Sequence, residues 1–337
     1  MSRGLTARRA TALLVAGGLA ALGACTGPRR QVGYPIDPEQ AAAVVRAYAA
    51  DWALVVSRRD RDALRRIQAG DALRATAAQL QALEGTGGAS PAAPRAGEVK
   101  VFVAPSEAPR APASFLALVT WTSPETDPER ELLEFQRAGP DDPWRVDLRA
   151  RLISNTPPPA IVADGAGRAD TVDARRANEL RFSGEQVVET LSGYYSDDDA
   201  DALVPLLDTL VAPGPFSSGL VKRRTQSNQS FQLQHQRDYR PGRYRTRAYR
   251  LGDGGGLMLV SLEGTRRMYA KEPTLVTLQQ DASREQLGGL VPPGLYSSLT
   301  YQTVTMLAVE VPPAKSRRPL RVDGWREIDL SVDATPA

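Results

Sequence analysis

Two reactive residue types are almost missing from this chain of 337 residues, which has one cysteine, Cys25, and one histidine, His235. A lone cysteine cannot close a disulfide within the chain, and a zinc site with two or more histidines is excluded. Any Ser-His-Asp triad would have to use His235. The fold must therefore be stabilised by packing. The chain has few of the residues that the commonest zinc sites and nucleophilic mechanisms require.

The N-terminal residues also lack acidic charge and differ sharply from the rest of the chain. Arg3, Arg8 and Arg9 precede the uncharged run 10–24. A basic head, a short apolar run and small residues at its end predict a signal peptide over residues 1–24. The run is shorter than the roughly 20 residues that a membrane-spanning helix needs.

The end of this run, Leu22, Gly23, Ala24 and Cys25, resembles the lipobox of bacterial lipoproteins. In that family the cysteine receives a diacylglycerol and the peptide is cut just before it. The resemblance implies lipidation at Cys25, a lipidated tether over residues 25–36, and anchoring on the extracytoplasmic face of the cell membrane. An ordinary secretory signal with an unrelated cysteine is the alternative.

Net charge gives no sign of a nucleic-acid partner. Removing the three leader arginines from 42 basic residues leaves 39, which equals the 39 acidic residues. The basic character of the full chain thus largely reflects the leader, and we expect no nucleic acid among the partners.

Periodicity predicts the same order of elements twice. Asp37 and Pro38 begin a helical region, and four strand-like runs follow it: Val99–Ala104, Ser114–Thr122, Glu131–Ala138 and Trp144–Leu152. After a proline- and glycine-rich stretch, Ser183 is a credible N-cap for another helix that precedes more strands. We therefore expect an α+β fold with a first domain over 37–155, a linker over 156–182 and a second domain over 183–333.

A short echo supports this division. "DPWRVDL" begins at Asp142 and "DGWREIDL" begins at Asp323, so that Trp144 and Trp325 each open a final strand. The repeat predicts that these are the closing strands of two related domains. Chance similarity between two amphipathic strands is the alternative.

Helices followed by an antiparallel sheet that ends in a D-G-W-R-type strand resemble the nuclear-transport-factor-2-like cone fold. The resemblance implies two domains in tandem, each with helices packed on a curved sheet. It points towards lipid-anchored proteins of actinobacteria, and the alanine- and arginine-rich composition is typical of a GC-rich genome. Enzymes with this fold use a Tyr/Asp pair in an apolar pocket, for which Tyr48 with Asp51 and Tyr194 with Asp197 are the candidates. Core aromatics beside solvated or capping acids are the competing interpretation.

Three other segments have the composition of a binding site. Arg243, Arg245 and Arg247 would share one face of an extended strand and could contact an anion, whereas a solvated strand edge is the alternative. The acids Asp197, Asp198, Asp199 and Asp201 lack the glycine and distal glutamate of a calcium loop. The glycine-rich run 252–256 lacks phosphate-loop spacing and predicts a hairpin turn.

The sequence thus predicts a non-catalytic, lipid-anchored envelope protein that acts as an interaction or assembly module, without cofactor or metal. Its partners would be the membrane, through the lipid, and envelope proteins or anionic wall polymers. A carrier of a small apolar ligand or lipid is the alternative, and an enzyme with a Tyr/Asp pair comes third.

Overall fold

The computed structural model describes residues 34–86, 94–105, 112–123, 126–153, 157–196, 209–223, 233–270, 276–278 and 294–337. The predicted signal peptide, the lipobox with Cys25 and most of the tether lie outside the described residues. The acids at 197–201 lie outside them as well.

The first half begins with three helices, α1 (Pro38–Arg58), α2 (Arg61–Ile67) and α3 (Gly70–Thr86). The Asp37 carboxylate accepts a hydrogen bond from the backbone N–H of Gln40, and Pro38 lies at the first turn, so the predicted start of α1 is confirmed. Arg59 adopts a left-handed conformation (φ 54°), which ends α1. Asp60 then caps α2 through the N–H groups of the next turn.

Four antiparallel strands follow these helices, β1 (Arg95–Val103), β2 (Ala113–Ser123), β3 (Thr126–Arg137) and β4 (Arg145–Leu152). Each pairs with the next along the chain, as the four predicted runs require. The second half contains α4 (Gly184–Tyr195), for which Ser183 and Gln186 form a capping box. Its strands are β5 (Thr171–Asp173), β6 (Leu233–Pro241), β7 (Arg247–Arg250), β8 (Gly256–Ala270), β9 (Val276–Leu278), β10 (Gly294–Val311) and β11 (Arg321–Pro336).

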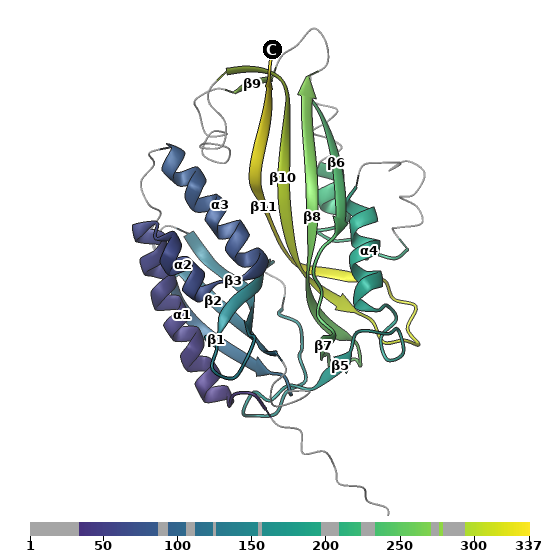
Figure 1. Cartoon of the computed structure of the whole chain (residues 1–337). Helices are drawn as coiled ribbons and strands as arrows, with labels where there is room; N and C mark the ends of the chain where they lie inside the picture. Colours follow the sequence, from purple (N-terminus) through teal and green to yellow (C-terminus); the bar gives the residue numbers. More distant parts are fainter. Residues whose placement is uncertain are drawn as a thin grey trace, which may run out of the picture.

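All eleven strands belong to one sheet, with the order β1-β2-β3-β4-β11-β10-β8-β7-β5, while β6 pairs with β8 and β9 with β10. The expectation of two α+β domains, each with its own cone-like sheet under its own helices, is therefore wrong (Figure 1). The two halves meet where β4 pairs with β11, in the pairs Gly324–Leu152 and Trp325–Arg151. We call this β4–β11 junction the seam.

The Asp-x-Trp-Arg echo thus marks the two strands that join the halves. A close approach at Gly324 permits this pairing, since an added Cβ would lie 3.0 Å from the Cβ of Ala308 and 3.1 Å from the carbonyl oxygen of Arg151. Trp325 packs against Tyr195 of α4, whereas Trp144 packs on Phe115 of β2.

The sheet is apolar on both faces. In β2, Phe115, Ala117 and Val119 face a core that includes α1, while Leu116 and Leu118 belong to a second core with β8 and β10. In β8, Leu257 and Leu259 join that second core, while alternate residues pack with α4. The two halves of the sheet consequently pack on each other, with helices on the outside. Helix α3 lies across the seam, against β4 and β11.

Beyond the helices, β8, β10 and β11 continue as a long ribbon (Figure 1). Tyr296, Leu299 and Tyr301 form a small core of their own there, and the Arg266 guanidinium lies 4.2 Å from the ring centre of Tyr301. Among the described residues, no helix combines the length and apolar character needed to cross a membrane.

Candidate functional site

A buried carboxylate, Glu131 on β3, is the centre of the polar contacts on the α1 side of the sheet. Arg149 on β4 donates to both of its oxygens, at 2.7 and 2.6 Å, and the Trp121 indole N–H donates at 3.0 Å. Burial alone would raise the pKa of Glu131, but Arg149 and then Arg326 outweigh burial and lower it. The carboxylate is therefore ionised in the folded protein.

Arg326 brings the second half of the chain into this group. It lies one position after Trp325 on β11, and its Nη1 donates to Glu131 at 3.2 Å. Burial and repulsion from Arg149 lower the pKa of Arg326 to about 10. Two guanidinium groups thus share one carboxylate, and we call these three residues the Glu131 cluster.

The predicted Tyr48/Asp51 pair is not assembled beside this cluster. Tyr48 is buried, and its hydroxyl accepts a hydrogen bond of 2.9 Å from the side-chain amide of Gln68. Burial raises the pKa of Tyr48, so the phenol stays protonated near neutral pH. Asp51 lies on the exposed side of α1. Tyr194 is buried against Tyr195, and Asp197 lies outside the described residues.

A second ionic group lies between the halves and uses the arginines that the sequence singled out. Arg245 donates to Glu134 at 3.0 Å and also pairs with Asp147. Arg243 lies 3.4 Å from Asp147 and 3.9 Å from Asp71. We call these five residues the Asp147 cluster. Its three carboxylates are 1 to 3% exposed.

The three predicted arginines therefore do not behave as one strand face. Arg243 and Arg245 lie in the connection between β6 and β7, and the anions that they contact are carboxylates of this chain. Arg247 begins β7 and donates to the carbonyl oxygen of Pro105 at 2.8 Å. Contact of these arginines with an external anion stays a prediction.

Sequence reasoning missed the acidic partners. Asp147 stands inside a strand run that is otherwise apolar or basic, and Glu134 stands between the apolar residues Leu133 and Phe135. A charge at such a position signals a buried partner elsewhere in the chain. Asp71 accepts a hydrogen bond of 2.6 Å from the Ser261 hydroxyl on β8, a contact that spans most of the chain. Composition contains no sign of such long-range pairs.

Other candidates can now be placed. The 252–256 run forms the predicted turn between β7 and β8, in which the N–H of Gly254 donates to the carbonyl of Leu251. His235 lies on β6, where burial, followed by Arg237 and Arg266, lowers its pKa to about 4. Among the described residues, no group of three or more metal-ligating side chains could hold an ion.

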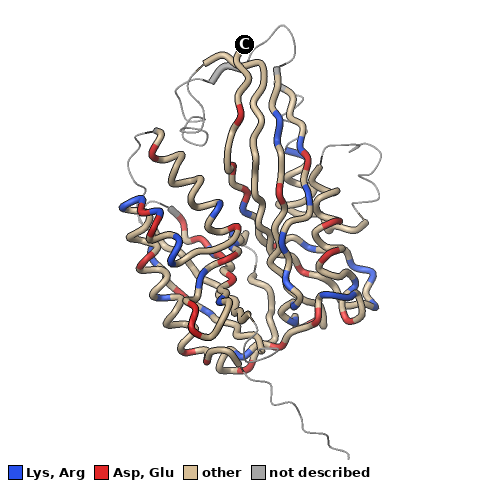
Figure 2. The backbone as a smooth tube through the Cα atoms, in the orientation of Figure 1, with Lys and Arg blue, Asp and Glu red and all other residues tan. Residues whose placement is uncertain are grey.

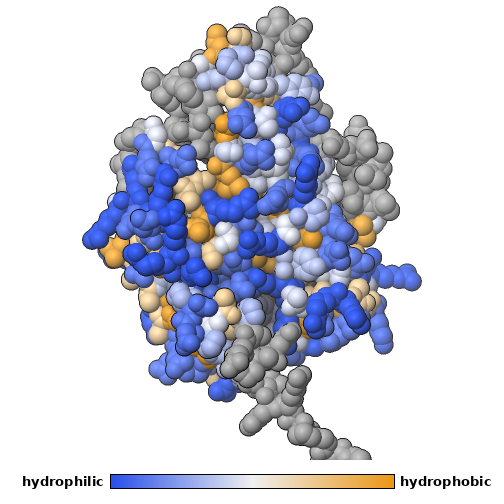
Figure 3. Space-filling view, in the orientation of Figure 1, coloured by the Kyte–Doolittle hydropathy of each residue, from blue (hydrophilic) through white to orange (hydrophobic). Residues whose placement is uncertain are grey.

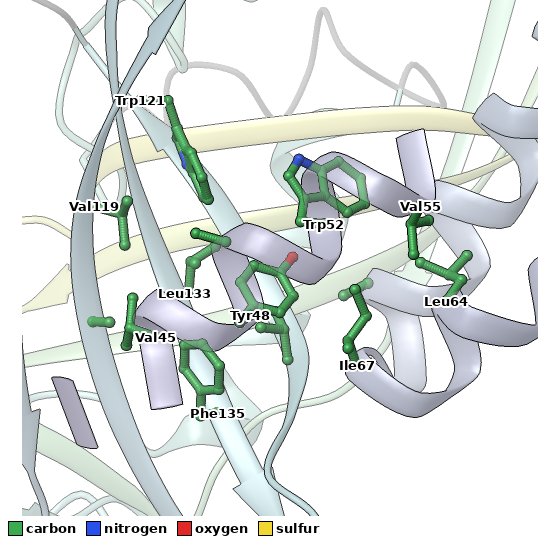
Figure 4. Close-up of a cluster of buried hydrophobic side chains, with 14 of the residues drawn as sticks. Val45, Tyr48, Trp52, Val55, Leu64, Ile67, Val119, Trp121, Leu133 and Phe135 are labelled. Atoms are coloured by element: carbon green, nitrogen blue, oxygen red, sulfur yellow. The ribbon is translucent and has the colours of Figure 1, made fainter. Parts of the chain in front are cut away.

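An open depression of about 430 Å³ lies beside the first turn of α1. Its lining is mainly polar or small: Asp37, Pro38, Glu39, Val101, Ala166 and Arg168. The aromatic interior lies elsewhere, where Tyr48, Trp52, Trp121 and Phe135 pack together (Figure 4). The face in Figure 3 is largely hydrophilic, with apolar residues in small separate patches.

These features define a single-sheet protein whose two halves are held together by buried ionic clusters. The chain belongs to the family described as "Domain of unknown function (DUF8094)", whose model matches residues 36–327. No curated protein and no solved structure matches the chain. The family match spans both halves and the seam, but its description names no activity. None of these comparisons confirms the resemblance to the nuclear-transport-factor-2-like fold.

Proposed function

We propose that this protein is a lipid-anchored, extracytoplasmic envelope protein that acts as a non-catalytic interaction or assembly module. Anchoring rests on the N-terminal pattern alone, with Cys25 as the lipidated residue and residues 1–24 removed. The folded body begins within a short tether of that cysteine, since α1 starts at Pro38. Two acyl chains hold a protein on a membrane far better than one.

The observation that carries the non-catalytic proposal is the filling of the interior. Trp52, Trp121 and Tyr194 belong to the two cores that contain α1 and α4, and they are 7, 7 and 8% exposed. A carrier of an apolar ligand would need a hollow lined by such residues. Here the aromatic side chains pack on one another and on the sheet instead.

The two ionic clusters also support a structural role. Each ionised group in them has a charged partner of opposite sign within the chain, and the pairs of Arg245 with Glu134 and Asp147 and of Arg326 with Glu131 join opposite halves. A catalytic acid or base needs access to a substrate proton. The Tyr48 hydroxyl is instead enclosed beside Gln68, and Asp51 faces away from it.

Photocrosslinking in intact cells tests the module proposal. A photoreactive residue would replace exposed Leu54 on α1, Val162 in the central connection or Leu295 on the ribbon, which are 49, 40 and 53% exposed. We expect one surface to give a discrete conjugate with an envelope protein or wall polymer. Conjugation to lipid alone at all three positions would contradict the proposal and favour a carrier.

Anchoring is tested separately by fatty-acid labelling and fractionation. The wild-type chain should incorporate label and sediment with membranes. Cys25→Ser should lose the label. Retention of label in Cys25→Ser would show that the lipoprotein interpretation is wrong, whatever the crosslinking result.

A further inference from the structure

Basic side chains gather around the turn between β10 and β11. This turn contains Lys315, Arg317 and Arg318, all exposed and with no acid between residues 311 and 322. It contacts the segment before α4, because the N–H of Ala314 donates to the carbonyl of Glu179. We define the basic face as Arg175, Arg176, Arg181, Lys315, Arg317 and Arg318.

Internal contacts fix the shape of the basic face. The Arg181 guanidinium donates to the carbonyl oxygens of Arg317 and Arg318, both at 2.5 Å, which holds the turn against the segment before α4. Arg318 pairs with Asp253 at 2.5 Å and Arg175 with Asp173 at 2.7 Å. These contacts hold the turn and its charged side chains against the folded body.

Two cations of the basic face, Lys315 and Arg317, have no ion pair with a carboxylate among the described residues. Arg176 acts on Asp173, whose pKa is lowered first by Arg175 and also by Arg176. A charged side chain at the surface needs no partner for stability, because water solvates it. Exposed cations around one turn nevertheless create a local positive potential that attracts anionic surfaces.

A series of contacts links the first described residues to the basic face. The Arg168 guanidinium lies 5.7 Å from the ring centre of Tyr34, the first described residue. Two positions further on, Asp170 pairs with Arg250, which also pairs with Glu179 in the segment that holds the basic turn. A short series of contacts thus connects the tether to the basic face.

In Figure 1 the first turn of α1 lies at the lower left and the turn between β10 and β11 at the lower right, and both lie away from the end at which the ribbon extends. Figure 2 shows blue Lys and Arg segments around the latter turn. The ribbon and the C-terminus extend from the opposite end (Figure 1). Nine positions separate Cys25 from Tyr34, a reach of at most about 30 Å when extended.

We propose that the basic face binds the anionic phospholipid headgroups of the membrane that holds the lipid on Cys25, so that the ribbon points away from that membrane. This rests on the proposed anchoring at Cys25. Arginine binds phosphate through paired hydrogen bonds, and a cluster of cations strengthens the membrane binding that acyl chains provide. The second attachment would restrict the orientation of the body, which a tether alone leaves free.

Vesicle binding by the unlipidated body, Thr26–Ala337, tests the basic face without the anchor. Every described helix and strand lies within this body. We expect it to bind vesicles of phosphatidylcholine with added phosphatidylglycerol more tightly than vesicles of phosphatidylcholine alone. Binding should weaken at about 1 M salt, where the screening length is roughly 3 Å.

A pair of matched double variants localises the effect. Each cation near an anionic surface strengthens partitioning about fivefold, so Lys315→Gln with Arg317→Gln should weaken it about 25-fold. Arg58→Gln at the C-terminal end of α1 with Arg66→Gln on α2 removes the same charge from exposed sites. The 21 residues of α1 span about 30 Å, so Arg58 lies far from the first turn of that helix. That control should bind as the parent does.

Orientation gives an independent readout, since the unlipidated body has no cysteine for a label to compete with. A polarity-sensitive dye on Ala314→Cys should change its emission with phosphatidylglycerol vesicles, while the same dye on Ser331→Cys in the ribbon should not. Binding that ignores phosphatidylglycerol, or equal losses in both double variants, would overturn the inference. Cys25→Ser labelling in cells decides the anchoring itself, so the two failures are distinguishable.

Discussion

The guanidinium of Arg326 lies 3.2 Å from the carboxylate of Glu131, although 195 positions separate them in the chain. Arg326 belongs to the "DGWREIDL" echo, and Glu131 belongs to the first half's own meander. Their contact shows that the repeated motif connects the halves. The same pair also predicts how the protein responds to substitution.

Glu131→Ala should destabilise the fold by about 3–5 kcal/mol, because Arg149 and Arg326 would be left buried without a counter-charge. Urea denaturation followed by circular dichroism measures the loss. Glu129→Ala is the matched control, since Glu129 pairs with Arg151 on the same two strands but both side chains are at least 36% exposed. The control should lose less than about 1 kcal/mol. Equal losses would contradict a central role for Glu131.

Arg245→Ala should cost about 3 kcal/mol or more at neutral pH, because Glu134 would be left buried without its cation and Asp147 would keep only Arg243. Burial already raises the pKa of Glu134, even with Arg245 present. In the variant Glu134 would protonate more readily, so the loss should shrink as the pH falls. Arg240→Ala, at a site 79% exposed, should leave stability nearly unchanged at every pH. A loss independent of pH would indicate packing as the cause.

Gly70→Ala should destabilise the protein by about 1–3 kcal/mol, because position 70 has a φ of 50° that residues with a Cβ rarely adopt. An added Cβ would also lie 2.0 Å from an oxygen of Asp147, which would disturb the Asp147 cluster. Gly165→Ala meets no heavy atom within 4 Å and should change the melting temperature little. Similar melting temperatures for both variants would show that the junction before α3 is not tightly constrained.

The single histidine offers a direct electrostatic test. Burial and the neighbouring arginines lower the pKa of His235 to about 4, against 6.5 in an unfolded chain. A group with a lowered pKa contributes stability above pH 6.5, and this contribution is lost as the pH falls towards 4. The imidazole resonances of the folded protein should titrate near pH 4, and His235→Gln should remove this part of the pH dependence. Titration near 6.5 would place His235 in solvent.

The local elements could be predicted from the sequence because their signals are local. Asp37 with Pro38 and the Ser183 capping box specify helix starts within a few residues. Alternating or continuous apolar runs predicted β1 to β4 within a few residues of their observed bounds, apart from the start of β3. These patterns depend on backbone geometry and on immediate neighbours, which a single sequence contains.

The arrangement of the sheet could not be predicted in the same way. The seam consists of two residue pairs, Gly324–Leu152 and Trp325–Arg151. Strand periodicity does not determine which strand edges pair with each other. The sequence does contain one signal of the observed arrangement. The apolar run of β2 is buried at Phe115, Leu116 and Ala117 alike, so both faces are covered. Such runs predict a sheet with a layer on each side rather than a half-open sheet under helices.

The candidate site was predicted in part. The arginine-rich segment around Arg245 was recognised as unusual, and the structure places it at the Asp147 cluster. Its acidic partners were missed, because Asp71, Glu134 and Asp147 come from three separate elements that only the folded chain brings together. The aromatic residues Tyr48 and Trp52 were weighed as core residues, and they are core residues.

Native mass spectrometry of the body, Thr26–Ala337, exported by a bacterial host without its lipid, tests the central claim most directly. The claim is that aromatic side chains such as Trp52, Trp121 and Tyr194 fill the interior, so that the protein works through its surface. A bare polypeptide mass for the protein as purified, with no added lipid, is the predicted result. A reproducible additional mass that survives gentle ionisation would contradict the claim and identify the protein as a carrier.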